Sequence, residues 1–123
     1  ARGLVDPTGF APVHARYSPA ELLGHLRTLR AGLGPDAAAA DPPVVVHGRP
    51  TLADTVLEAD TVTGYRGLDR AGIGDRYLDL AVVARDLAER VSPHALGPFF
   101  ATYGLASPDL RRIDVWLLLL ELL

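Results

Sequence analysis

The sequence of 123 residues contains no cysteine, lysine, methionine, asparagine or glutamine. Without cysteine, the chain has no thiolate nucleophile, disulfide scaffold, iron–sulfur cluster or cysteine-ligated zinc. The four histidines, His14, His25, His47 and His94, are scattered, and none has the spacing of a metal-ligand pair. We therefore expect neither a metal site nor a cofactor.

Positive charge and long apolar runs are also scarce. The formal net charge is −3 and the isoelectric point is near 5.7, so the chain has no general electrostatic attraction for nucleic acid or for anionic membranes. The longest apolar run, residues 115–120, is far shorter than the roughly 20 residues that cross a bilayer. No N-terminal signal segment is visible. We expect a cytoplasmic protein that binds neither nucleic acid nor membrane.

The composition, 49% hydrophobic and 22% charged, predicts one domain over residues 1–123. Its first helix should begin at Ser18-Pro19-Ala20-Glu21, a capping box with proline at the first helical position. Leucines at helical spacing follow, and glycine and proline at 32–35 should end the helix. His25, beside this stripe, is interpreted as a helix-surface histidine.

The middle of the chain predicts short strands. Val44-Val45-Val46 is typical of a buried strand, and residues 55–57 and 61–63 should form a hairpin around a polar turn at 58–60. Residues 64–74 are predicted to be a glycine-punctuated loop, and residues 37–40 a loop of alanines.

Three more helices are expected. One of about 13 residues lies between Asp75 and Arg90, whose charges suit the helix dipole. Ser92-Pro93 and Ser107-Pro108 are serine and proline start signals for helices over 94–103 and 108–123. The predicted fold class is α+β and mostly helical, with a β-hairpin and about four helices.

Two segments carry a family resemblance: His47-Gly48-Arg49-Pro50-Thr51-Leu52-Ala53-Asp54, and residues 62–81 with Asp75-Arg76-Tyr77-Leu78-Asp79. With them, residues 3–123 resemble the C-terminal lobe of aminoglycoside 3'-phosphotransferases. The resemblance implies a kinase-like fold. It also implies that the ATP-binding N-lobe is absent and, since the chain has no lysine, that the nucleotide-positioning lysine is missing too.

The resemblance implies replaced catalytic positions. Arg49 stands where the family has its catalytic aspartate, and a guanidinium cannot accept the substrate proton. Asp54 stands for a metal-binding asparagine, and Gly67 for a metal-binding aspartate. Arg66 and Asp69 replace an isoleucine and a glycine of the same motif. We therefore expect a pseudoenzyme rather than an enzyme.

On the antibiotic side, the resemblance implies acids facing an amino sugar: Glu89, Glu121 and the terminal carboxylate of Leu123. The segment of residues 115–121 departs from the family pattern, because leucines replace an arginine and an aspartate. A truncated, inactive phosphotransferase with weak aminoglycoside binding is the alternative function.

The favoured function is a protein-binding module built on this scaffold. Arg49, Tyr65, Arg66 and Arg70 would lie on neighbouring loops in the family fold, and arginine and tyrosine are enriched at binding hot spots. An acidic surface or cleft of a partner would suit them. The alternative for Arg49 and Arg66 is internal pairing with aspartates.

The last predicted helix offers a second surface. Trp116, Leu117 and Leu120, with the final leucines, make it apolar around most of its circumference, so self-association or another protein should cover it. The start at Ala1, the truncation and the clustered replacements together favour an engineered scaffold.

Overall fold

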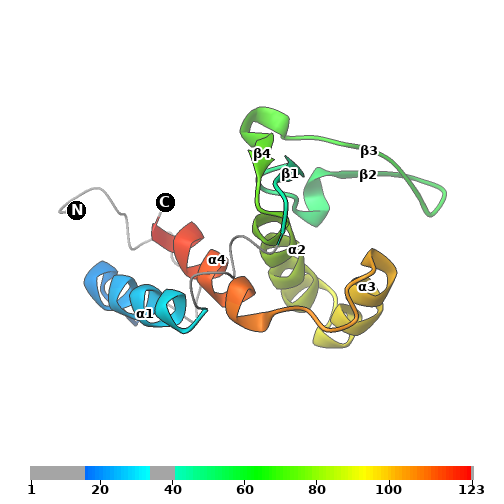
Figure 1. The fold of residues 1–123 in the computed structure, drawn as a ribbon. Helices are drawn as coiled ribbons and strands as arrows, with labels where there is room; N and C mark the ends of the chain where they lie inside the picture. The colour runs from blue at the N-terminus through cyan, green and yellow to red at the C-terminus, as the bar shows by residue number, and fades with distance from the viewer. Residues whose placement is uncertain (1–15, 34–40, 123) are drawn as a thin grey trace. The chain divides into compact units, whose positions relative to one another are not determined.

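The protein is described here by a computed structural model that covers residues 16–33 and 41–122. One helix, short strands and then three helices follow one another along the chain (Figure 1), which confirms the predicted α+β, mostly helical class. The packing divides the chain into two compact units. One contains the first and last helices, and the other spans residues 41–109. The predicted loop over residues 37–40 lies outside the described residues.

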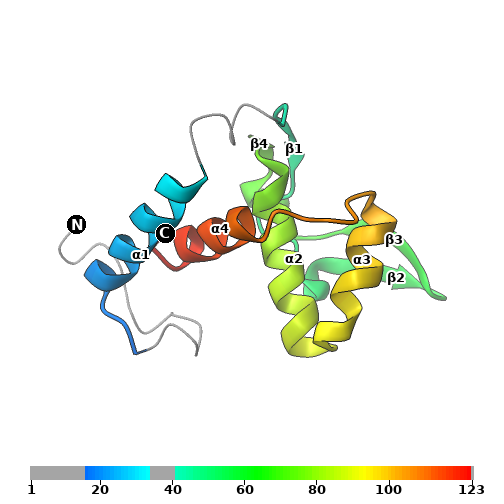
Figure 2. The same cartoon turned by 60° about the horizontal axis from the view of Figure 1, so that its bottom comes forward.

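The first unit pairs helix α1 (Pro19–Gly32) with helix α4 (Leu110–Leu122), which lie side by side in Figures 1 and 2. The predicted capping box is confirmed, because the backbone amide of Glu21 donates to the Ser18 hydroxyl at 3.3 Å and the Ser18 amide donates to the Glu21 carboxylate at 2.7 Å. The core of the unit consists of side chains from both helices: Leu22, Leu26, Val115 and Leu118.

The second unit contains two small antiparallel sheets. Strand β1 (Val44–Val46) pairs with β4 (Gly72–Gly74), so that Val45 lies opposite Ile73. The prediction of a buried strand is wrong for one face, since Val46 is 5% exposed but Val45 is 79% exposed. Side chains of a strand alternate between faces, and only one face of this pair is covered.

Strand β4 corrects the predicted loop over residues 64–74. Two of its three residues are glycines, which have low β-propensity, so the local pattern favours a loop. The backbone is extended there because it pairs with β1, which lies far away in the sequence. A short 3₁₀ helix, η3 (Leu68–Arg70), precedes it.

The predicted hairpin is confirmed as strands β2 (Thr55–Glu58) and β3 (Thr61–Tyr65). Ala59 and Asp60 connect the strands with φ angles of 45° and 65°. Two successive positive φ angles are typical of the type I′ turn, whose twist matches that of a hairpin. A 3₁₀ helix, η2 (Leu52–Asp54), leads into β2.

Helix α2 (Arg76–Arg90) is the central element of the second unit and contacts β1, η2 and helix α3 (Leu96–Tyr103), as Figure 2 shows for the two helices. The Asp75 side chain caps α2 by accepting from the Tyr77 amide at 2.9 Å. Its buried face carries Tyr77, Leu80, Ala81, Val82 and Ala84.

The helix starts agree with the sequence signals, with small shifts. The Ser92 hydroxyl accepts from the His94 amide, and a 3₁₀ turn η4 (Pro93–Ala95) opens into α3. Helix α4 begins at Leu110, two residues after the expected proline. None of the helices in the described ranges combines the length and the apolar character needed to cross a membrane.

Candidate functional site

The site is built on the loop that follows β1. Asp79 of α2 accepts hydrogen bonds from two successive backbone amides, His47 at 2.7 Å and Gly48 at 2.9 Å. The carboxylate therefore fixes the direction in which the chain leaves the strand, and it positions Arg49 at the tip of the loop. Charge-assisted bonds of this kind are stronger than those between neutral groups.

His47 ties the same loop to the end of β3. Its Nδ1 accepts from the Arg49 amide at 3.2 Å, and its Nε2 is hydrogen-bonded to the Arg66 carbonyl. Both bonds are satisfied by the neutral ring that carries its proton on Nε2, because Nδ1 must accept and Nε2 must donate. His47 therefore links the loop after β1 to the residue that follows β3.

Gly48 brings this loop against a third segment. Its φ is +95°, and a Cβ added there would stand 2.4 Å from the Arg70 carbonyl oxygen and 2.7 Å from the Arg70 Cβ. No side chain fits in that space. Since Arg49 follows directly in the chain, the absence of a side chain at position 48 sets Arg49 close to Arg70.

Asp54, at the end of η2, provides a carboxylate beside the loop. The Thr51 hydroxyl donates to its Oδ2 at 2.7 Å, and this bond is the largest cause that lowers the pKa of Asp54 below its ordinary value. The Asp54 carbonyl accepts from the Arg66 amide at 2.7 Å. Asp54 is therefore ionised at neutral pH and is held next to the end of β3.

Position 67 faces this carboxylate directly. Gly67 has a φ of +68°, and a Cβ built on it would lie 3.1 Å from Asp54 Oδ1. A side chain at position 67 would therefore extend toward the Asp54 side chain. With glycine there, Asp54 contributes the carboxylate at this spot and position 67 contributes none.

Helix α2 also holds η2 in place through Asp86. Its Oδ2 accepts from the Leu52 amide at 2.6 Å, and its Oδ1 accepts from Arg90 Nε at 2.8 Å. The Asp86 side chain is buried, so these bonds replace the water that its charge has lost. Arg90 is thus neutralised by a neighbour one helical turn away.

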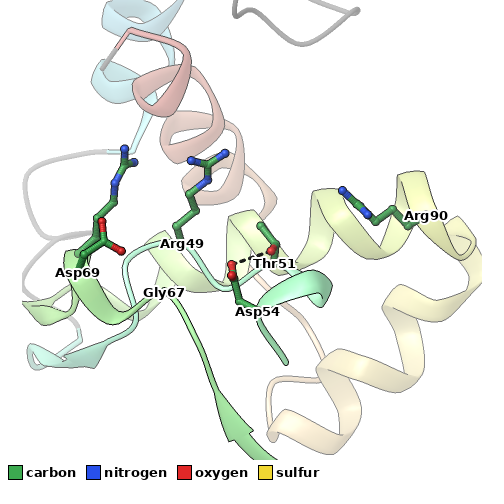
Figure 3. Close-up of a pocket in the computed structure, with 7 residues that line it drawn as sticks. Arg49, Thr51, Asp54, Gly67, Asp69 and Arg90 are labelled. Carbon is green, nitrogen blue, oxygen red and sulfur yellow. Dashed lines mark hydrogen bonds between the residues drawn. The ribbon is translucent and has the colours of Figure 1, made fainter. Parts of the chain in front are cut away.

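These segments surround an open depression of about 360 Å³. Figure 3 shows Arg49 reaching it from the loop after β1, Asp54 from η2 and Arg90 from α2. The lining carries three arginines and two aspartates and consists of Arg49, Thr51, Asp54, Gly67, Asp69, Arg70 and Arg90. It offers hydrogen-bond donors to an anion and, at Asp54, acceptors to a cation.

The four residues predicted to bind an acidic partner, Arg49, Tyr65, Arg66 and Arg70, all lie in the second unit. Two of them line the depression. Arg49 and Arg70 are lining residues, whereas Arg66 is exposed beside them. Tyr65 is 59% exposed and its ring meets that of His47 edge-on, with centroids 6.3 Å apart. Within residues 16–33 and 41–122, neither Arg49 nor Arg66 forms the internal ion pair weighed as the alternative.

The other predicted residues lie elsewhere. Trp116, Leu117 and Leu120 on α4 are half-buried. Glu89 is exposed near the end of α2, and Glu121 on α4 is 9% exposed. Because Glu89 and Glu121 belong to different units, each is described only within its own. Leu123 lies outside the described residues.

Sequence reasoning missed the residues that hold the site together. Thr51 and Arg90 line the depression, and Asp79 and Asp86 anchor its loops to α2. A signal existed only for Arg90, which follows Asp86 by four residues, the spacing of a helical ion pair. In the described ranges, no group of three histidine, aspartate or glutamate side chains is placed to hold a metal ion.

Comparisons with known proteins are consistent across sequence and structure, although no protein-family model matches the chain. The streptomycin 3''-kinase of Streptomyces griseus is 40% identical over an alignment of 125 positions, which covers 95% of this chain and 44% of the kinase. An aminoglycoside 3'-phosphotransferase of Escherichia coli is 42% identical over 80 residues, which are 65% of this chain and 29% of the relative.

A solved structure superimposes over nearly the whole chain. It is the aminoglycoside phosphotransferase APH(3'')-Id from Streptomyces rimosus in complex with ADP and streptomycin, with a TM-score of 0.77 and 31% identity over 96% of this chain and 46% of that one. An aminoglycoside-3'-phosphotransferase of type VIII gives a TM-score of 0.75 at 26% identity.

The mixed helices and short antiparallel strands are therefore those of a kinase-like fold. Within that fold, the chain is related to the aminoglycoside phosphotransferases, as the two sequence segments predicted. The chain spans less than half the length of the relatives it matches, which is consistent with a C-terminal fragment of such a protein.

Proposed function

We propose that the chain is a non-catalytic binding module on an aminoglycoside phosphotransferase scaffold. In this proposal it binds a partner protein with an acidic surface or cleft through Arg49, Tyr65, Arg66 and Arg70. The observation that carries it is the exposed Arg49 side chain, which has no ion pair in the described residues, at the position where the family resemblance puts a catalytic aspartate.

Phosphoryl transfer fits these side chains poorly. A guanidinium stays protonated and cannot accept the proton of a substrate hydroxyl. Loss of a general base alone costs about two to four orders of magnitude in rate. Asp54 retains oxygens for a magnesium ion, but Gly67, which stands where the resemblance puts a second ligand, has none in its side chain.

Three features of the exposed face support partner binding. Arg49, Arg66 and Arg70 have no ion pair in the described part of the chain, so their charge is available to an acidic surface. Tyr65 lies beside them and adds an exposed aromatic ring. The loop that carries Arg49 is held by Asp79, so a partner meets a preformed surface.

The half-buried apolar residues of α4, Trp116, Leu117 and Leu120, are the second surface of the proposal, for self-association or for the same partner. The engineered origin favoured by the clustered replacements stays a prediction.

The alternative is a truncated, inactive aminoglycoside phosphotransferase that retains weak aminoglycoside binding. It is supported by the relative solved with ADP and streptomycin, which matches 96% of this chain. In that case Glu89, Glu121 and the carboxylate of Leu123 would bind the amino groups of the drug.

The two proposals differ in the sign of the ligand charge. We would titrate the chain calorimetrically with kanamycin, with streptomycin and with a short polyglutamate peptide, all at low salt. The binding module predicts saturable binding of the peptide that Arg49→Asp abolishes and that Arg27→Asp, at an exposed position of α1, leaves intact. Saturable binding of an aminoglycoside that is lost in Glu89→Gln would instead establish the alternative.

Catalysis needs its own test. When the chain is incubated with magnesium–ATP and kanamycin, the proposal predicts that mass spectrometry detects no phosphorylated product. The Arg49→Asp variant should likewise give no product. Product from the unmodified chain would refute the proposed function outright.

A further inference from the structure

We infer that Arg49 and Arg70 together form a binding site for a single phosphate monoester group, which they hold without a metal ion. The inference rests on the proposed function, because it names the anionic group that the exposed arginine face would recognise.

The two arginines are brought together by the backbone rather than by their side chains. Gly48 lies so close to Arg70 that an added Cβ would meet the Arg70 backbone at 2.4 Å, and Arg49 is the next residue in the chain. The loop that carries Arg49 is itself held by two amide bonds to Asp79. The backbone segments that carry the two side chains are therefore held next to each other before any ligand arrives.

Their charges lack a partner in contact. Both side chains are exposed, and neither makes an ion pair within the described residues. Arg90, the third arginine of the depression, differs because Asp86 neutralises it at 2.8 Å. Two neighbouring positive charges repel each other. An anion that contacts both is attracted to each of them, and this attraction offsets the repulsion.

The aspartates of the depression narrow the choice of ligand. Asp54 and Asp69 also line it, so an extended polyanion would meet like charge as well as the arginines. A compact anion held at the two guanidinium groups avoids this. The interior of the depression therefore favours one small charged group, whereas a longer acidic ligand would contact the arginines only from the exposed face.

The charge and the donor geometry favour phosphate over carboxylate. A guanidinium presents a planar fork that matches two oxygens, so one arginine satisfies a carboxylate. A phosphate monoester carries close to two negative charges above pH 7 and three terminal oxygens, enough for both forks. The depression of about 360 Å³ has room for the group and for part of the ester attached to it.

The experiment is a titration of the intact chain at pH 8 with EDTA present, followed by ³¹P NMR and calorimetry. The probes are phenyl phosphate, inorganic phosphate and acetate. We expect saturable binding of phenyl phosphate, with acetate at least about tenfold weaker. Arg49→Gln and Arg70→Gln should each weaken phenyl phosphate binding about tenfold, the usual effect of losing a bond to a charged group. Arg27→Gln on α1 should not.

Three results would overturn the site. These are acetate binding as tightly as phenyl phosphate, unchanged affinity in both glutamine variants, and binding that appears only when magnesium replaces EDTA. Binding of inorganic phosphate without phenyl phosphate would exclude a monoester. Circular dichroism of the variants checks that each is folded.

Failure of this site and failure of the proposed function are separable. If polyglutamate binds and phenyl phosphate does not, the acidic-partner proposal stands and the phosphate site falls. If phenyl phosphate binds and polyglutamate does not, the phosphate site stands without the protein partner.

Discussion

The carboxylate of Asp86 accepts a 2.6 Å hydrogen bond from the backbone amide of Leu52, which lies 34 residues earlier in the chain. Through this bond, helix α2 holds the 3₁₀ turn that ends at Asp54. The wall of the depression that carries Thr51 and Asp54 therefore depends on a residue outside the lining.

Replacing Asp86 should test that dependence. Asp86→Ala leaves the Leu52 amide without its acceptor, and loss of a buried charged bond should cost about 1–3 kcal/mol of the free energy of unfolding. Urea denaturation measures the loss, and hydrogen exchange at the Leu52 amide should accelerate. Glu89→Ala, on the exposed face of the same helix, is the matched control and should change the stability by less than about 0.5 kcal/mol. Equal stability of the Asp86 variant and the parent would contradict this account.

Position 48 should tolerate only glycine. Gly48→Ala puts a methyl group 2.4 Å from a backbone oxygen in a left-handed conformation, so we expect a loss of about 2 kcal/mol or more. The midpoint of thermal unfolding would show it. At Gly72, no atom lies within 4 Å of an added Cβ and φ is not positive, so Gly72→Ala serves as the control with little effect. A parent-like midpoint for Gly48→Ala would mean that the loop does not pack against Arg70.

Replacing a glycine by alanine in helix α1 should increase the stability of the protein. Gly24 is exposed in the middle of α1, and nothing lies within 4 Å of a Cβ added there. Gly24→Ala should therefore stabilise the protein by about 0.5–1 kcal/mol, because alanine restricts the unfolded chain and favours the helix. Chemical denaturation checks the sign. Lower stability would show that the surface of α1 at Gly24 is not open.

The capping box of α1 should respond to pH. Hydrogen bonds from Ser18, first from its backbone amide and then from its hydroxyl, lower the pKa of Glu21. A carboxyl whose pKa is lower in the folded state stabilises it above the unfolded pKa and loses this effect as the pH falls through the folded value. The contribution should thus be complete near neutral pH and disappear in acid.

An NMR titration of the Glu21 carboxyl tests this directly. Ser18→Ala removes the hydroxyl and should raise the pKa of Glu21 toward its ordinary value, while Ser92→Ala, at another helix start, should leave it unchanged. A Glu21 pKa that does not move in Ser18→Ala would show that the hydroxyl contributes nothing.

Much of the fold was predictable because its signals are local. Ser18 with Glu21 marks one helix start, Asp75 marks another, and the residue pair Ala59 and Asp60 closes a hairpin. Each of these is an interaction between residues within a few positions of one another, so the sequence displays both partners at once. The same holds for the leucine spacing that places Leu22 and Leu26 in a core.

The site was predictable only in part. The family resemblance pointed to Arg49 and Arg70, which both line the depression, but no single-sequence pattern links Leu52 to Asp86 or Gly48 to Arg70. Thr51 has no local feature that distinguishes it from any other threonine. Such pairs become visible only when segments far apart in the chain are brought together.

The sequence by itself determined the helix starts, the hairpin and the related family, because these depend on neighbouring residues or on matched motifs. Tertiary structure decided that Gly72-Ile73-Gly74 is a strand, that Val45 faces solvent while Val46 is buried, and that Asp79 directs the loop of Arg49. The reason is physical: a three-residue strand with two glycines, a half-covered sheet and a partly buried carboxylate are each stable only with partners that lie about 30 residues away, where local propensity has no influence.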